Sequence, residues 1–198
     1  MAKKKISEKG YVVFDTETTG LTPQHEILEI YLYHPDTGRE FYTKIKPQNI
    51  EIASPRALEI NGYTEEKWKD APDFQDVIVD IARFMKNRIA VGHNIQFDLN
   101  MLKWGVARLP EDFVKRQKVY IPYHCIDTVT LAQEHLVPMG LESVSMDNIR
   151  KFLGWSKHGA HTAKKDVKDT YRLFKLLFRA GIRKKAKIRL MHRLFGEK

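Results

Sequence analysis

Short apolar runs in the first part of the chain predict three strands. The run Tyr11-Val12-Val13-Phe14 is apolar, aromatic and β-branched, which is typical of a buried strand. Two more strands are expected at Ile27 to Tyr33 and at Glu40 to Lys46, joined by a turn that contains proline and glycine. Because these segments follow one another directly, we expect them to pair as a meander.

Helices and strands alternate along the rest of the chain. Apolar residues recur with a helical period from Phe74 to Met85 and predict an amphipathic helix. The other expected elements are a strand ending at Val91, a strand at Tyr123 to Ile126, and helices at roughly Thr128 to His135, Val144 to Leu153 and Thr162 to Phe178. A meander followed by a β-α-β unit predicts an α/β fold, with a mixed five-stranded sheet and helices on both faces.

An acidic pair ends the first predicted strand. Side chains alternate across a strand, so Asp15 and Glu17 share a face and Thr16 points the other way. Like charges this close raise each other's pKa unless a cation neutralises them. An oxygen-only ligand set favours Mg²⁺ or Mn²⁺ over zinc. The alternative is that the pair merely ends the strand and caps a loop.

A third carboxylate lies on the predicted helix from Thr162 to Phe178. Its apolar residues occupy one arc and its basic residues the opposite one, and Asp166 falls at the margin of the apolar arc. A carboxylate turned toward a core needs a partner, either a metal ion or a cationic side chain. His161 lies just before this helix, where it is a candidate base that titrates near neutral pH. The alternative for His161 is a surface or capping residue.

Asp98 completes the acidic set. It follows the apolar run Ile89-Ala90-Val91, where His93-Asn94 breaks the strand and Phe97-Asp98-Leu99 begins a helix. An aspartate in a first helical turn is also what the helix dipole favours. Only the presence of the other acidic residues makes a metal-binding role the stronger interpretation.

Three motifs carry a family resemblance. FDTETTGL, GHN-x2-FD and H-x4-D, in this order and at these separations, resemble the motifs of the DnaQ-like, DEDDh-type 3′→5′ exonucleases. This family includes the proofreading subunit of bacterial replicative DNA polymerases. The resemblance extends to ASPRALEINGYTEE, to CIDTVTLAQ and to the helix that ends near residue 178. It implies a ribonuclease H-like fold for the predicted sheet.

The resemblance also implies a role for each motif residue. Asp15 would bridge two metal ions, Glu17 and Asp166 would complete the tighter site, and Asp98 would hold the second ion through water. His161 would be the general base that takes a proton from the attacking water. The residues implied to contact the 3′-terminal nucleotide are Thr18, Gly20 and Leu21 on one side, and His93, Asn94 and Phe97 on the opposite wall.

Composition agrees with a nucleic-acid partner. The chain holds 34 Lys+Arg against 25 Asp+Glu, a net charge of +9, which suits a partner made of phosphates, although basic charge also serves solubility. Cys125 is the only cysteine, so neither a disulfide framework nor a zinc-type spacing is expected. No apolar run is long enough to cross a membrane, and no signal-peptide pattern follows the lysine-rich start. We therefore expect an intracellular protein.

The two ends differ from the centre in composition. We expect a basic segment at 1–9, an exonuclease domain at 10–180 and a basic amphipathic helix at 181–198. Three interpretations of the last helix are open: packing on the domain, contact with nucleic acid, or docking of a partner such as a polymerase or a sliding clamp. Leu194-Phe195 resembles the ending of sliding-clamp peptides, but that match is short.

The favoured function is a metal-dependent 3′→5′ exonuclease that removes nucleotides from the 3′ end of DNA, with single strands favoured. Two metal ions would clamp the scissile phosphate. The alternatives are a 3′→5′ exoribonuclease, because a metal site reads phosphates rather than sugars, and a non-catalytic nucleic-acid-binding adaptor on the same fold. The presence of all five chemical residues argues against the adaptor.

Overall fold

A five-stranded mixed sheet forms the centre of the protein. The structure, a computed structural model, describes residues 10–156, 162–178 and 182–195. The strands are β1 (Gly10–Thr18), β2 (Ile27–Tyr33), β3 (Glu40–Lys44), β4 (Arg88–Gly92) and β5 (Cys125–Asp127), in the order β3-β2-β1-β4-β5. β1, β2 and β3 pair antiparallel, whereas β4 pairs parallel with both β1 and β5. The predicted meander and β-α-β unit are confirmed.

Helices connect and cover the strands. The helices in the first part are η2 (Ile50–Ile52), α1 (Pro55–Ile60), α2 (Glu65–Trp68), α3 (Phe74–Met85), α4 (Ile95–Ala107) and α5 (Glu111–Gln117). Those in the second part are α6 (Thr128–His135), η3 (Val137–Met139), α7 (Met146–Phe152), α8 (Ala163–Leu177) and α9 (Ile182–Phe195). The helices expected at 74–85 and 128–135 are confirmed residue for residue, and α8 is one residue shorter at each end than expected.

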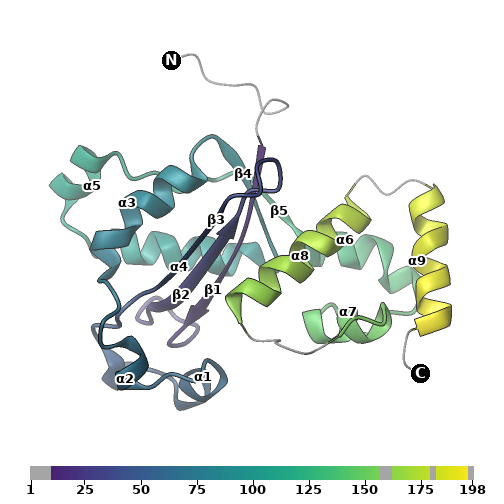
Figure 1. The fold of residues 1–198 in the computed structure, drawn as a ribbon, viewed down its shortest axis with the longest axis horizontal. Helices are drawn as coiled ribbons and strands as arrows, with labels where there is room; N and C mark the ends of the chain where they lie inside the picture. Colours follow the sequence, from purple (N-terminus) through teal and green to yellow (C-terminus); the bar gives the residue numbers. More distant parts are fainter. Residues whose placement is uncertain (1–9, 157–161, 179–181, 196–198) are drawn as a thin grey trace.

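Alternation along the central strand divides the core into two layers. Val12 and Phe14 of β1 pack with the apolar residues of α3 and α4, while Val13 packs on the opposite face with Val167 and Phe174 of α8. Figure 1 shows α8 crossing one face of the sheet, with α3 and α4 on the other side. Helices on both faces were predicted, and this arrangement confirms them.

Several boundaries differ from the prediction, and β3 ends at Lys44 rather than at Lys46. The fifth strand was expected at Tyr123 to Ile126 but spans Cys125–Asp127, and Tyr123 is 68% exposed. An aromatic residue beside an apolar run matched the strand pattern, although this ring lies outside the sheet. The helix expected from Val144 begins at Met146 instead, because the hydroxyl of Ser145 caps it by accepting from the backbone N–H of Asn148.

A satellite core holds the C-terminal helix against the domain. Ile188 of α9 is fully buried among apolar residues of α6, α7 and α8. The ring of His192 stacks on Phe152 at 3.7 Å between centroids, and its Nδ1 lies 3.0 Å from the Phe152 carbonyl oxygen. These contacts support packing among the three interpretations of this helix. Across the described ranges, no helix combines the length and the apolar character that crossing a bilayer requires.

Candidate metal centre

The central strand presents two carboxylates on the face that α8 covers. Asp15 and Glu17 follow Val13 at intervals of two residues, so all three point to the same side of β1. A register shift between Glu17 and Thr18 ends the regular pairing with β2. The pair therefore lies where the strand leaves the sheet, as the sequence predicted.

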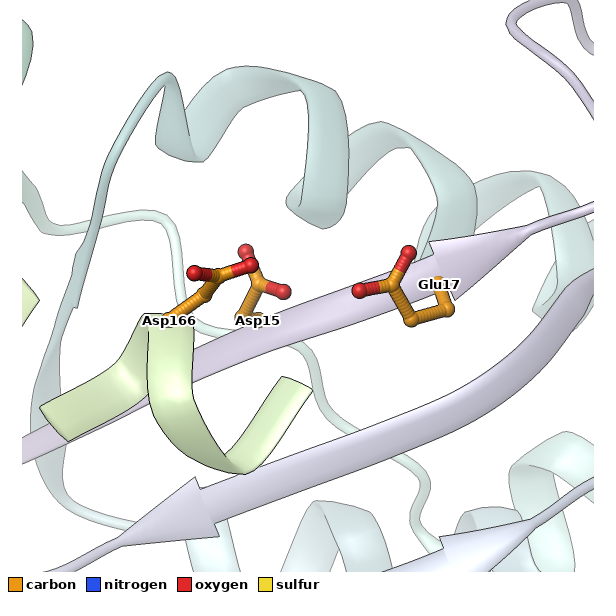
Figure 2. Close-up of side chains that lie close together, drawn as sticks. All are labelled: Asp15, Glu17 and Asp166. Atoms are coloured by element: carbon orange, nitrogen blue, oxygen red, sulfur yellow. The ribbon is translucent and has the colours of Figure 1, made fainter. Parts of the chain in front are cut away.

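The first turn of α8 brings a third carboxylate to the pair. Thr162 caps this helix, and its side chain accepts a hydrogen bond from the backbone N–H of Lys165. Asp166 follows in the first turn and faces the end of β1. One oxygen from each of Asp15, Glu17 and Asp166 lies within 4.8 Å of the others, and Figure 2 shows the three carboxylates turned toward a common space.

Burial and repulsion from neighbouring carboxylates disfavour the charged forms of Asp15 and Glu17. Burial is the main cause that raises the pKa of Asp15 well above its ordinary value, and neighbouring carboxylates, Asp98 first, raise it further. Burial likewise raises the pKa of Glu17 to about 8, with the charge of Asp166 as the next cause. A cation placed among these oxygens would reverse both effects.

The donor set fits a hard divalent cation. Three carboxylates that converge within one ligand sphere offer oxygen atoms only, which suits Mg²⁺ or Mn²⁺ better than the sulfur and nitrogen ligands of zinc sites. The raised pKa values of Asp15 and Glu17 indicate that the surrounding side chains do not neutralise these two carboxylates. Asp15, Glu17 and Asp166 are therefore the residues that could hold such an ion.

Asp98 approaches the same strand from the other face of the sheet. It lies in the first turn of α4, is 3% exposed, and its Oδ1 accepts from the backbone N–H and the hydroxyl of Thr16 at 2.9 and 2.6 Å. Burial raises the pKa of Asp98 to about 7, although the two bonds from Thr16 oppose the shift. Asp98 is thus tied to the backbone between Asp15 and Glu17, outside the converging group of three.

One residue of the site was missed by the sequence reasoning. Arg150 of α7 is 1% exposed, and its guanidinium donates to Asp166, to Asp169 at 2.8 Å and to Asp147 at 2.8 Å. Burial opposes its charge, but the bonds to Asp169 and Asp166 raise its pKa above the ordinary value. The sequence predicted a metal ion or a cationic side chain as the partner of Asp166, and the structure provides the cation.

The end of β1 and the loop after it contain three of the residues expected to contact a terminal nucleotide. The Thr18 hydroxyl donates to the Gly20 carbonyl at 2.8 Å, and the Thr18 carbonyl accepts from Asn61 Nδ2 at 2.9 Å. A Cβ on Gly20 would lie 2.3 Å from the His25 ring, so any larger residue there would displace that ring. Leu21 is 77% exposed at the tip, free to touch a ligand.

The opposite wall follows β4. His93 uses both ring nitrogens within the protein, at 2.9 Å from the Thr128 hydroxyl and 2.9 Å from the Val144 carbonyl. Asn94 adopts a left-handed conformation with φ of 64° at the start of α4, and Phe97 packs partly buried against the core. His93 therefore holds this wall in place. His161, the expected base, lies outside the described residues.

The sequence of the whole domain can be assigned to a family. A family model described as Exonuclease matches residues 12–174, which spans every described residue of the metal centre. The chain belongs to the exonuclease family. This membership confirms the family inferred from the three motifs and the enzyme class that the resemblance implied, an exonuclease.

Curated relatives of this exonuclease domain are named as DNA polymerase III proteins. A DNA polymerase III PolC-type protein of Thermotoga petrophila is 33% identical over 186 residues, which cover 90% of this chain and 13% of that protein. A DNA polymerase III subunit epsilon of Treponema pallidum is 29% identical, over 83% of this chain and 74% of that protein. The chain thus spans a small part of the PolC-type relatives it matches.

Solved structures confirm the fold. Escherichia coli exonuclease I in complex with a dT13 oligonucleotide aligns with a TM-score of 0.68 at 19% identity, covering 87% of this chain and 41% of that one. Another structure of exonuclease I gives a TM-score of 0.70 at 20% identity, over 91% of this chain and 43% of that one. The ribonuclease H-like fold expected from the motifs is the fold that this exonuclease domain adopts.

Proposed function

We propose that this exonuclease is a metal-dependent 3′→5′ enzyme that hydrolyses the terminal phosphodiester bond of single-stranded DNA. The observation that carries the proposal is the convergence of three carboxylate oxygens, from Asp15, Glu17 and Asp166, within 4.8 Å. No cationic side chain other than Arg150 is hydrogen-bonded to any of the three in the described part of the chain. Such a cluster supports metal-assisted attack on a phosphate.

The residues divide the chemistry among them. Asp15, Glu17 and Asp166 would hold Mg²⁺ or Mn²⁺, and Asp98 would contribute to a second ion. When bound, two such ions supply Lewis-acid activation of water and stabilise the leaving oxygen. Arg150 holds Asp166, and the hydrogen bonds from Thr16 to Asp98 fix the strand between the ligands. His161 would accept the proton of the attacking water.

Support for a DNA substrate comes from charge and from the relatives. The net charge of +9 favours a polyanion. Relatives are named as parts of DNA polymerase III, and a solved neighbour holds a dT13 oligonucleotide. By the same comparison, we propose a replicative polymerase as a candidate partner. The metal centre itself reads phosphates, so an RNA strand is the competing substrate.

Polarity and substrate are tested together with labelled strands. Matched single-stranded DNA and RNA carrying a 5′ label are incubated with the protein and Mg²⁺, and product length is followed over time. A 3′→5′ exonuclease shortens the labelled strand in single steps, leaves closed circles intact and stops in excess chelator. Cleavage of circles would identify an endonuclease instead, and full activity in chelator would exclude the metal-dependent mechanism.

The role of His161 is tested by substitution. His161→Ala is expected to lower the cleavage rate by about 10²- to 10⁴-fold, the usual range for general acid-base catalysis, while strand binding persists. The wild-type rate should also fall as the pH drops through about 6.5, where an ordinary imidazole becomes protonated. His124→Ala, remote from the three carboxylates, is the control. A rate within twofold of wild type for His161→Ala would exclude the role.

A further inference from the structure

The sheet face that carries the metal centre continues onto the two neighbouring strands. In the strand register, Asp15 pairs with Tyr31, which pairs with Tyr42. Glu17 likewise pairs with Glu29, which pairs with Lys44. Directly paired residues share a face of an antiparallel sheet. The side chains of β2 and β3 at these positions therefore lie beside the carboxylate cluster, on the side that α8 covers.

A groove of about 730 Å³ lies over these residues. Its floor is formed by β2 and β3, and its sides by the segment from Asn61 to Trp68 and by the start of α8. The lining side chains used below are Tyr31, Tyr42, Lys44, Lys67, Trp68 and Lys164. The metal centre is at one end of this groove, because Thr162 and Lys164 precede Asp166 in the same helix.

Cationic and aromatic side chains interleave along the groove. The Lys44 ammonium lies 4.1 Å from the centroid of the Trp68 ring, and that of Lys164 lies 5.5 Å from the Tyr31 ring. Lys67 is exposed, and its ammonium donates to the Gly62 carbonyl at 3.0 Å. Lysines that follow a backbone beside rings on which bases can stack are the pattern of single-strand binding sites.

Two features show that the groove suits a ligand. The Tyr42 ring is 51% exposed, so one of its faces is available for stacking. Asn61 Oδ1 is buried and has no hydrogen-bond partner among the described residues.

The acidic residues that line the groove are Glu29 and Glu40, and Glu40 is paired with Lys164 at 3.3 Å. The three lysines of the lining, Lys44, Lys67 and Lys164, outnumber these two glutamates, so the lining side chains carry a net positive charge.

The order of the strands in the sheet indicates which nucleotides of a bound single strand would lie in the groove. β1, with the cluster, lies between β4 on one side and β2 and β3 on the other. The residues assigned to the terminal nucleotide lie at the end of β1, in the loop that follows it, and after β4. A strand whose last nucleotide lies there and whose scissile phosphate lies at the cluster continues over β2 and β3. Neighbouring strands are about 4.8 Å apart, so β3 is about 10 Å from β1, within reach of the next nucleotides.

We propose that this groove binds the single strand immediately 5′ of the scissile bond, by stacking a base on Tyr42 and by contacts from Lys67 and Lys44 to phosphates. The proposal rests on the function proposed above and adds a second binding site to it. The terminal nucleotide alone determines the chemistry, while the groove determines how tightly a longer strand is held.

The test separates the two sites by substrate length. The double variant Tyr42→Ala, Lys67→Ala is compared with a control double variant, Tyr123→Ala, Lys115→Ala. The control removes the same two kinds of side chain outside the groove, one just before β5 and one on α5. Tyr123 is 68% exposed, and Lys115 pairs only with Glu111 on its own helix among the described residues. One assay follows the p-nitrophenyl ester of thymidine 5′-monophosphate, which has no upstream nucleotide. The other measures the Kd of ten-nucleotide single-stranded DNA in chelator, with Asp15→Asn added to each variant.

The groove variant is expected to hydrolyse the ester at the wild-type rate and to bind the ten-nucleotide strand about 10-fold or more weakly. The slope of log affinity against log salt should fall by about 0.7 for the lost lysine contact. If the Kd and the salt slope of Tyr42→Ala, Lys67→Ala equalled those of the control variant, the proposed binding role of the groove would be wrong. Failure of the wild type to hydrolyse either the ester or the strand would instead overturn the proposed function, since the binding assay does not depend on cleavage.

Discussion

Asp15→Asn is expected to lower the cleavage rate by about 10³-fold or more while leaving the metal-free protein as stable as wild type, or more stable. A metal ion contributes several kcal/mol to transition-state stabilisation, and each 1.36 kcal/mol corresponds to a factor of ten. The amide keeps the shape of the carboxylate but removes a charge that burial and neighbouring carboxylates disfavour. The rate is measured on a labelled strand, and stability by thermal unfolding in chelator.

Asp80→Asn serves as the control, because Asp80 is 59% exposed on α3 and pairs only with Arg83 in the described part of the molecule. It should change neither the rate nor the melting temperature appreciably. If Asp15→Asn unfolded the protein, Asp15 would be a structural residue. If the variant kept its cleavage rate, the metal centre would have been assigned to the wrong residues.

Burial of Glu17, together with repulsion from neighbouring carboxylates, gives the metal-free protein a defined pH dependence. The pKa of Glu17 is raised from 4.5 to about 8, so the folded state retains a proton that the unfolded state has lost. Stability must therefore fall as the pH rises from about 4.5 to about 8, and level off above that value. We expect the melting temperature of Glu17→Gln minus that of wild type, in chelator, to grow over this range. Saturating Mn²⁺ should shrink the difference, whereas a constant difference would contradict the raised pKa.

Local periodicity was enough to predict that the three carboxylates of the candidate metal centre face one another. The alternation of β1 placed Asp15 and Glu17 on one face, and the helical period placed Asp166 at the margin of the apolar arc. Both inferences need only the geometry of a single element. The structure confirms these directions and brings the three carboxylates together. The fifth strand was predicted to begin two residues too early, because a three-residue strand carries too little pattern to fix its ends.

Contacts between distant elements could not be predicted in this way. The bond from Thr16 to Asp98 joins residues 82 positions apart, and nothing in either segment indicates the other. Arg150 lies three residues after Asp147, which on a helix is typical of a solvent-exposed ion pair. Only the packing of α7 against α8 buries Arg150 and turns it toward Asp166 and Asp169. A buried arginine within a mixed polar segment has no signal of its own.

Arg150→Met is expected to destabilise the metal-free protein by about 3–5 kcal/mol, the usual loss when one partner of a buried ion pair is removed. Asp166, Asp169 and Asp147 would lose a shared cation that is 1% exposed, and Lys165 would remain hydrogen-bonded to Asp169. For a chain of this size, the loss corresponds to a fall of about 6–20 °C in melting temperature.

Two comparisons distinguish this network from an ordinary ion pair. Arg83→Met removes an arginine that is 71% exposed and should cost no more than about 0.5 kcal/mol. Arg150→Lys keeps the charge but not the planar donors that bind several carboxylates at once, so its loss should be intermediate. Adding Mn²⁺ should restore part of the stability of Arg150→Met, because a metal ion at Asp166 neutralises a carboxylate that has lost the Arg150 guanidinium. A loss below about 1 kcal/mol would show that Arg150 does not hold the network together.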